Sequence, residues 1–304
     1  MSGPSASRAA AASVATALFL LGLKAVAAWR TGSVAMLGSL ADTGLDLVAS
    51  LVTLWGVRVA ATPADREHRF GHGKAEALAA LFQVALISVS AIGIGWQALS
   101  ALLGGETSRD AGYGIAVSVV AMLATVLLLG YQRRVIAATG SLAISADNVH
   151  YQSDFALNGA VILALVLEQW LGLGGADPVL GVAIALWLMF GAWRAASAAV
   201  DQLMDKEWPE EKRRRFLEIA ARHPELAGIH DLRTRTAGAQ DFVQFHVWVD
   251  PQMTVAEAHR VMDEVEARLA RDFPGVEILI HVDPEGQEDK EGVLPAAIAE
   301  EPSQ

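Results

Sequence analysis

Residues 34–60 read VAMLGSLADTGLDLVASLVTLWGVRVA, an apolar stretch interrupted by the carboxylates of Asp42 and Asp46. At about 1.5 Å of rise per residue, a helix of this length crosses the roughly 30 Å hydrocarbon core of a bilayer. Asp42 and Asp46 are four positions apart, so they share one face of that helix. Because an ionised carboxylate in lipid is costly, the pair needs a partner or a function.

Five further stretches of the 304-residue chain have the length and apolar composition of membrane-spanning helices. They cover Ala9–Trp29, Ala75–Leu103, Gly112–Ile136, Ser141–Leu171 and Pro178–Val200. We interpret the first as a spanning helix rather than a cleaved signal peptide, because its apolar run is about 20 residues long. Charged residues become frequent only after Asp205, so we predict an all-α, six-helix transmembrane domain over residues 1–205.

The chain after this boundary has a different pattern. We predict helices at Trp208–His223 and Val255–Asp272, and strands at Ile229–Thr236, Phe242–Val249 and Val276–Val282. This order predicts a small cytoplasmic α+β domain (αββαβ, metallochaperone-like) over residues 206–285, with one sheet under two helices. Residues 286–304 are acidic and rich in Pro, Gly and Ala, so we predict a disordered tail.

Composition and charge narrow the classes of function. A formal net charge of −11 argues against nucleic-acid binding, which usually needs a basic face. The chain has no cysteine, which excludes disulfides, thiolate metal sites and cysteine nucleophiles. It has no His-Glu-x-x-His motif, which argues against an intramembrane metalloenzyme. Basic residues gather after the second, fourth and sixth spans, so the positive-inside rule places both termini in the cytoplasm.

A second ionisable pair lies in the predicted fifth span, where His150 and Asp154 are also four apart. Asp42 and Asp46 lie roughly 12 and 18 Å from the outer end of their span, and His150 and Asp154 roughly 14 and 20 Å from the cytoplasmic end of theirs. These depths overlap, so two antiparallel helices bring one imidazole and three carboxylates together. Such donors suit Zn²⁺, and also Cd²⁺, Fe²⁺ or Mn²⁺. Two alternatives stay open: a proton relay without metal, and polar contacts that only join helices.

The link after the second span holds another candidate group. Asp65, His68 and His72 can ligate one metal if this segment curls, which Gly71 and Gly73 allow. The alternative is that these are solvated residues at the membrane surface.

The predicted soluble domain holds a third candidate group. Its members are His230 and His246 on the first two strands, His259 on the second helix, and His281 and Asp283 on the last strand. His281 and Asp283 are two positions apart, so they face the same side of an extended segment. Imidazole and carboxylate donors in a cysteine-free chain predict one or two zinc ions there. A histidine at a strand edge that is only solvated is the competing interpretation.

Four short motifs, spread from roughly Leu18 to Pro284, together resemble the cation diffusion facilitator family, in its bacterial zinc and ferrous-iron efflux branch. They are Thr31-Gly32-Ser33-Val34 leading to Asp42 and Asp46, Phe70-Gly71-His72-Gly73-Lys74-Ala75-Glu76, His150-Tyr151-Gln152-Ser153-Asp154, and Ile280-His281-Val282-Asp283-Pro284. Val282 departs from the pattern, because close relatives can carry a polar residue between the histidine and the aspartate. That departure affects hydrogen bonding around the ligands rather than the ligands themselves.

The resemblance implies a homodimeric secondary transporter, not an enzyme, that exchanges a divalent cation such as Zn²⁺ for protons by alternating access. It implies an inner-membrane protein with no organic cofactor. It makes Asp42, Asp46, His150 and Asp154 the transport site, Asp65, His68 and His72 a loop site, and His230, His246, His259, His281 and Asp283 a binuclear site between cytoplasmic domains. It also suggests that Lys74 and Asp205 form ion pairs near the membrane face of the dimer.

Two rivals to zinc export remain at this point. One is a membrane-bound zinc sensor, which would bind metal and move none. The other is transport of Fe²⁺, Cd²⁺ or Mn²⁺ by the same site, because these ions accept the same nitrogen and oxygen donors.

Overall fold

The computed structural model describes residues 3–31, 34–104, 114–171 and 176–286. The chain divides into two compact units, residues 1–201 and 202–304. Apart from Gly286, the predicted disordered tail lies outside the described residues.

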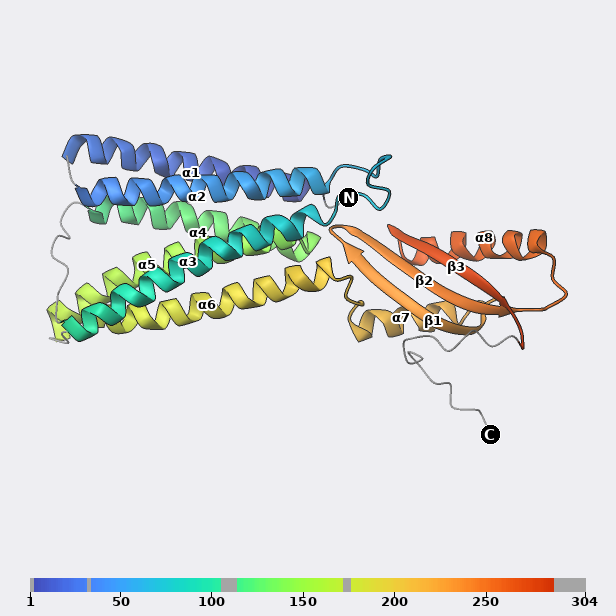
Figure 1. Cartoon of the computed structure of the whole chain (residues 1–304). Coiled ribbons are helices and arrows are strands. Elements are labelled where there is room, and N and C mark those ends of the chain that lie inside the picture. Colours follow the sequence, from blue (N-terminus) through green and yellow to red (C-terminus); the bar gives the residue numbers. More distant parts are fainter. Residues whose placement is uncertain (1–2, 32–33, 105–113, 172–175, 287–304) are drawn as a thin grey trace. The chain divides into compact units, whose positions relative to one another are not determined.

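The first unit consists of six long helices (Figure 1). They are α1 (Gly3–Thr31), α2 (Val34–Ala60), α3 (Ala75–Gly104), α4 (Gly114–Thr139), α5 (Leu142–Leu171) and α6 (Ala176–Leu203). In the described part of the chain, every one of these except α5 is long and apolar enough to cross a membrane. The first half of α5 instead carries His150, Asp154 and further polar side chains. The predicted fold class, a helical membrane domain followed by a small α+β domain, is confirmed.

Helix packing in this unit relies on small residues. Helix α1 packs on α2 and α4, α2 packs on α3, and both α3 and α4 pack on α5. Gly56 of α2 lies so close to α3 that a Cβ atom there would be 2.4 Å from the Cβ of Ala79. Leu188 and Ala192 of α6 join a cluster with Ile87 and Ala91 of α3. Small residues at contacts are typical of helices that associate in lipid.

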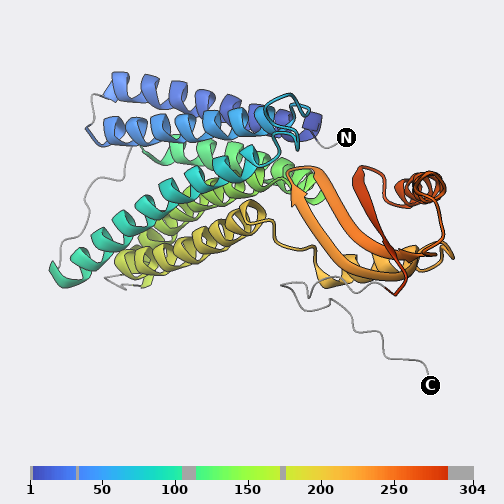
Figure 2. The same cartoon turned by 45° about the vertical axis from the view of Figure 1, so that its right-hand side comes forward.

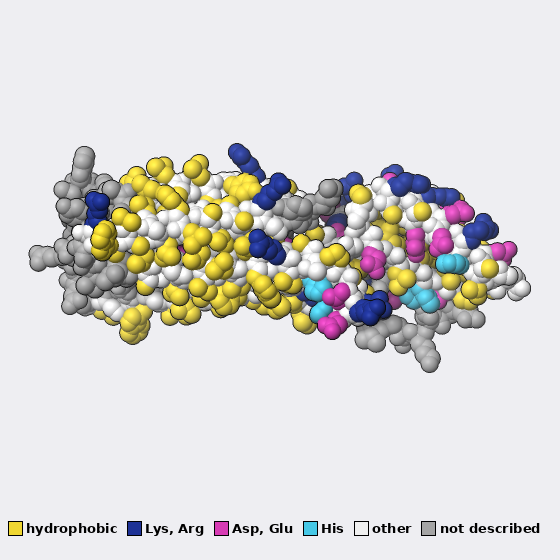
Figure 3. All heavy atoms as spheres, turned by 90° about the horizontal axis from the view of Figure 1, so that it is seen from above, with side chains coloured by type: hydrophobic (Ala, Val, Ile, Leu, Met, Phe, Trp, Pro, Cys, Tyr) yellow, Lys and Arg dark blue, Asp and Glu magenta, His cyan; other side chains and the backbone are white. Residues whose placement is uncertain are grey.

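The surface and the interior of the helical unit have the pattern of a membrane protein. Large apolar side chains cover the outside, including Trp96, Leu127 and Leu186, each more than 60% exposed. Figure 3 shows hydrophobic side chains spread over this unit. Polar side chains such as Gln83 and Asp147 are instead fully buried. An apolar outside is expected where the surrounding solvent is lipid.

The second unit contains one three-stranded sheet and two helices (Figure 2). Its elements are α7 (Glu210–Ala220), β1 (Ala227–Ala237), β2 (Gln240–Val249), α8 (Val255–Asp272) and β3 (Val276–Pro284). The strand order is β1-β2-β3, with β1 antiparallel and β3 parallel to the central β2.

Alternation along β2 decides which face of the sheet is covered. Val243, Phe245 and Val247 are buried in one core with Phe216 of α7 and Leu269 of α8. Successive side chains of a strand point to opposite faces, so the residues between these three project from the other face. That second face, which we call the open face, carries the histidines of the sheet.

Candidate metal sites

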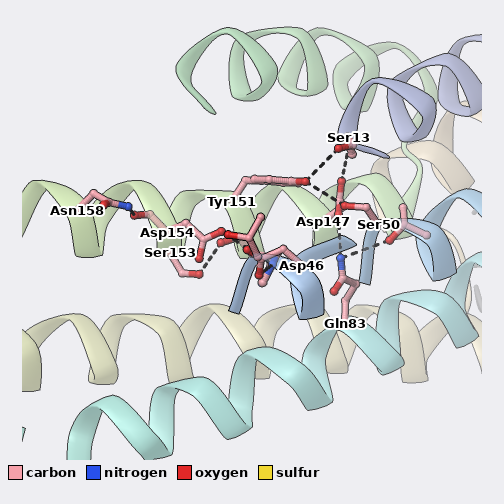
Figure 4. A network of polar contacts seen from close by, with 12 residues as sticks. Ser13, Asp46, Ser50, Gln83, Asp147, Tyr151, Ser153, Asp154 and Asn158 are labelled. Atoms are coloured by element: carbon pink, nitrogen blue, oxygen red, sulfur yellow. Dashed lines mark hydrogen bonds and ion pairs between the residues drawn. The ribbon is translucent and has the colours of Figure 1, made fainter. Parts of the chain in front are cut away.

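Helices α2 and α5 bring three of the predicted transport-site residues together. The Nε2 atom of His150 lies 3.0 Å from Oδ1 of Asp46 and 3.9 Å from Oδ2 of Asp154. One ligand atom from each residue lies within 4.8 Å of the others, a spacing at which one metal ion fits between them. Figure 4 shows Asp46 and Asp154 converging from the two helices. We refer to Asp46, His150 and Asp154 as the helix cluster.

Asp42 lies outside the helix cluster. It sits one turn before Asp46 on α2, and its side chain is exposed. Its neighbour Thr43 is buried and accepts a hydrogen bond from Nζ of Lys24 at 2.6 Å. Lys24, on α1, is an ionisable residue in a spanning helix that our sequence analysis missed. The signal that could have found it is the rule that any such residue marks a candidate site.

Side chains next to the helix cluster fix the position of α5. The hydroxyl of Tyr151 lies 3.0 Å from Oγ of Ser50 on α2 and donates to the backbone oxygen of Ser13 on α1. At the start of α5, Oγ of Ser141 donates to a buried carboxylate oxygen of Glu76 on α3 at 2.6 Å. Contacts from three helices therefore orient the first half of α5, on which His150 lies.

The link between α2 and α3 brings the loop-site residues together. Oδ2 of Asp65 lies 3.5 Å from Nε2 of His72, and Oδ1 lies 3.5 Å from Nδ1 of His68. The backbone N–H of His68, donated to Asp65 at 2.6 Å, holds the pKa of that carboxyl below its usual value. Gly71 allows the curl through its positive φ of 77°. The other ring nitrogen of His72, Nδ1, is buried and has no hydrogen-bond partner in the described structure.

Three residues of the predicted cytoplasmic site meet on the open face of the sheet. Oδ2 of Asp283 lies 2.8 Å from Nδ1 of His246 and 3.3 Å from Nε2 of His230. Their ligand atoms lie within 4.8 Å of one another. His281 is adjacent, with Nε2 3.3 Å from the other oxygen of Asp283. His246 and His281 are register partners on neighbouring parallel strands, which explains their shared face.

The hydrogen bonding of His230 fits a metal ligand. Its Nδ1 lies 2.8 Å from the backbone oxygen of Gly228 and donates to it. In the neutral ring, this bond assigns the lone pair to Nε2, the nitrogen that faces Asp283. Metal-bound histidines usually hold their second ring nitrogen in this way. The site's donors therefore suit a zinc ion, which would be held by imidazole nitrogens and carboxylate oxygens.

His259 is not part of this group within one chain. It lies on α8, its side chain is 77% exposed, and its Nδ1 is 3.6 Å from Oδ1 of Asp263.

Lys74 and Asp205 belong to the two different units, so their ion pair stays a prediction. Asp205 has a positive φ of 54° and a carboxylate oxygen 3.6 Å from Nη1 of Arg235.

Comparison with known proteins places the chain. A family model described as the cation efflux transmembrane domain matches residues 10–204, and one described as the cation efflux protein cytoplasmic domain matches residues 208–285. The chain belongs to the cation diffusion facilitator family. Membership makes it a transporter rather than an enzyme, and one that carries divalent metal cations out.

Relatives of this cation diffusion facilitator match it over nearly their whole length. The cation-efflux pump FieF of Serratia proteamaculans is 44% identical over 276 residues, which is 91% of this chain and 92% of that protein. FieF of Escherichia coli K12 is 41% identical over 286 residues, 94% and 95% of the two chains. A solved structure of CzrB in its Zn form is 42% identical, covers 28% of this chain and 99% of its own, and has a TM-score of 0.25.

Two further acidic residues of this cation diffusion facilitator were missed from the sequence. Asp231 follows His230 with a positive φ of 46°, and its Oδ2 lies 3.7 Å from Nε2 of His246. Asp147 is fully buried in α5, three residues before His150. The signal for Asp147 was present, because it is an acid in a predicted span. Asp231 gave none, because its approach to His246 depends on a register irregularity in β1.

Proposed function

We propose that this protein is a homodimeric Zn²⁺/H⁺ antiporter that exports zinc from the cytoplasm by alternating access. The observation that carries the proposal is the helix cluster, in which carboxylate oxygens of Asp46 and Asp154 lie 3.0 and 3.9 Å from the Nε2 atom of His150. Ligands on two helices can bind one ion together only while the relative position of the helices keeps those ligands close to one another. A change in their relative position therefore changes the affinity, as an alternating-access transporter requires.

The chemistry of the helix cluster suits zinc as the transported substrate. One imidazole nitrogen and carboxylate oxygens form the tetrahedral N/O set that zinc accepts. Asp42 completes this set in the proposal, because it shares a helix face with Asp46. The absence of cysteine from the sequence leaves no thiolate to bind the ion so tightly that it could not leave.

Proton exchange follows from the same residues. Metal ligands must be deprotonated, so zinc binding releases protons and protons compete with zinc. In the metal-free protein, the 3.0 Å contact between His150 and Asp46 holds a proton where the ion would bind. Zinc arriving from the cytoplasm displaces that proton, and protons on the outer side displace zinc.

The other two groups serve regulation in this proposal. Zinc held by the cytoplasmic site, including His259 from a second copy of the chain, favours one arrangement of the dimer. A ligand shifts such an equilibrium only through its different affinity for the two states. The loop site takes part in the same response, and the Lys74–Asp205 pair stabilises the dimer near the membrane.

The proposed location is the inner membrane, with both termini in the cytoplasm. Basic residues support it, since Arg133 and Arg134 lie in the last two turns of α4 while Lys206 follows α6. Links that carry more Lys and Arg stay on the cytoplasmic side.

The test is zinc and proton flux in proteoliposomes that contain the full-length protein. Wild type should move zinc with opposite proton movement, reported by dyes inside the vesicles for each ion. Asp46→Asn should abolish both fluxes, because it removes a charge between the two helices. Asp272→Asn, at the exposed end of α8, is the matched control and should behave as wild type. Normal zinc flux by Asp46→Asn would end the assignment.

A second candidate substrate is Fe²⁺, and Cd²⁺ or Mn²⁺ would use the same donors. The FieF relatives are named cation-efflux pumps, a name that does not restrict the ion to zinc. Competition separates these possibilities, since the preferred ion should block zinc flux at the lowest concentration. A zinc sensor would instead bind zinc at all three groups and give no flux of any ion.

A further inference from the structure

Asp147 is a buried carboxylate that the proposed mechanism does not use. It lies on α5 one turn from His150, and its side chain is fully buried. Three hydrogen bonds reach it. Ser13 Oγ and Gln132 Nε2 donate to Oδ2 at 2.6 and 2.7 Å, and Gln83 Nε2 donates to Oδ1 at 2.8 Å. Figure 4 shows Ser13 and Gln83 approaching Asp147 from two other helices.

All three donors are neutral, and they come from α1, α3 and α4. Among the described residues, His150 and Tyr151 of its own helix are titratable groups that interact electrostatically with Asp147. Its hydrogen bonds in the described structure include none from lysine or arginine. A buried carboxylate in this position either stays ionised, with its charge stabilised only by hydrogen bonds from neutral groups, or binds a proton.

Gln83 can hydrogen-bond to Asp147 in both its ionised and its protonated form. Its Nε2 donates to Asp147, lies 3.3 Å from Oγ1 of Thr53, and leaves Oε1 buried with no hydrogen-bond partner among the described residues. Rotating the amide by half a turn exchanges its oxygen and nitrogen. Oε1 would then accept from the hydroxyl of Thr53 and from a protonated Asp147. Each form of Asp147 therefore meets a matching group on Gln83.

We propose that Asp147 is a proton-binding site separate from the helix cluster, and that the Gln83 amide rotates to serve its ionised and protonated forms. The proton adds to Oδ1 and leaves from the same atom, so no bond between heavy atoms changes. Asp147 lies between the helix cluster and the start of α5 at Leu142. If α5 starts on the cytoplasmic side, Asp147 is a base one helical turn from His150 toward the cytoplasm, and it can accept a proton that zinc displaces from His150. This last step rests on the proposed antiport.

Infrared difference spectroscopy of the metal-free, full-length protein in lipid tests the site directly. The carbonyl stretch of a protonated carboxylic acid should appear at acidic pH and disappear at alkaline pH. Asp147→Asn should remove one such band, and in this variant a rotated Gln83 can accept from the new amide. To separate it from the helix cluster, both spectra are taken in an Asp46→Asn, Asp154→Asn background. A band set unchanged by Asp147→Asn would overturn the proposal.

A second variant keeps the test decisive if Asp147→Asn does not fold. Gln132→Leu removes one donor from the ionised carboxylate but no acceptor from its protonated form, since Oε1 of Gln132 already accepts from Asn148, so the carboxylic-acid band should persist to a pH about one unit higher. Ser50→Ala, which removes a polar group that contacts Tyr151 rather than Asp147, is the control and should leave the band's pH range unchanged. An unchanged range in Gln132→Leu would also overturn the proposal.

Failure here and failure of the proposed function give different results. The band requires neither zinc nor transport. Its presence in a protein that moves no zinc would contradict the antiporter alone. Zinc flux in a protein without the band would contradict the role of Asp147 alone.

Discussion

The Nε2 atom of His150 on α5 lies 3.0 Å from Oδ1 of Asp46 on α2. These residues are 104 positions apart in sequence, so only the packing of the two helices makes them neighbours. The contact places a proton-binding group and a carboxylate at one point inside an apolar bundle. A site of this kind responds to metal, to protons and to any movement of one helix against the other.

A double-mutant cycle should show that Asp46 and His150 bind the same ion. Asp46→Asn and His150→Gln should each weaken zinc binding at the helix cluster by about 10- to 100-fold, as the loss of a charged hydrogen-bonding partner does. The double variant should lose much less affinity for zinc than the product of the two single losses, because its second substitution removes a ligand from a site that has already lost one. Calorimetric titration of purified protein measures this. The matched cycle, Asp46→Asn with His246→Gln, should be additive, and additivity in both cycles would contradict a shared ion.

The close approach at Gly56 predicts a specific sensitivity of the helical unit. Gly56→Ala places a methyl group 2.4 Å from the Cβ of Ala79, so α2 and α3 must separate. Overpacking of this kind costs about 1–3 kcal/mol. Thermal unfolding in detergent should show the loss. Gly44→Ala on the same helix meets no atom within 4 Å and should be neutral or stabilising. Equal behaviour of the two variants would mean that α2 and α3 do not pack as described.

Trp248 should report metal at the cytoplasmic site. Its ring centre lies 5.2 Å from that of His230, and its indole lies against Gly228. Zinc binding by His230 should therefore change tryptophan fluorescence, and Trp248→Phe should remove that change. Trp193→Phe, on α6, is the control and should leave it intact. Asp283→Asn should raise the zinc concentration at which half of the fluorescence change occurs, because Asp283 contacts all three histidines of the open face. A response unaffected by Trp248→Phe would contradict this site.

The start of α8 should depend on pH through its capping box. The side chain of Thr254 accepts from the backbone of Glu257, and the Glu257 carboxylate accepts from the backbone of Thr254. The backbone N–H of Thr254, followed by its hydroxyl, lowers the pKa of Glu257 from its usual 4.5. A lowered pKa means that this stabilisation is present above pH 4.5 and is lost as the pH falls through the lowered value.

Amide hydrogen exchange in the first turn of α8 measures this effect. Thr254→Ala should speed exchange there about fivefold at neutral pH, and Thr254→Ser should restore protection. If Thr254→Ala exchanged no faster than wild type, the cap would contribute nothing to α8.

Much of the fold was predictable because it depends on patterns that neighbouring residues carry. Helix α8 was predicted at its observed limits, since its apolar residues recur with helical spacing between a capping threonine and a Pro-Gly break. The span at α2 was predicted equally well. The pairing of β2 with β3 was not predicted, because parallel strands joined through a helix leave no local signal of their register.

The candidate sites were predictable as residue types and only partly as geometry. Spacing by four put His150 and Asp154 on one face, which the structure retains. Spacing could not show that Asp42 stands apart from the group of Asp46, His150 and Asp154, since that depends on which turn of α2 lies opposite His150. Asp147 could have been singled out as an acid in a predicted span, but its hydrogen-bond partners, Ser13, Gln83 and Gln132, could not, because they come from three distant parts of the sequence.

The location of zinc by anomalous diffraction from crystals of the zinc-loaded protein tests the central claim most directly. The account predicts a peak about 2.0 Å from Nε2 of His150 and from a carboxylate oxygen of both Asp46 and Asp154. That peak should be absent from crystals of Asp46→Asn, while the peak beside His246 and Asp283 remains. Crystals of a transport-competent protein with zinc on the cytoplasmic domain and none between α2 and α5 would contradict it.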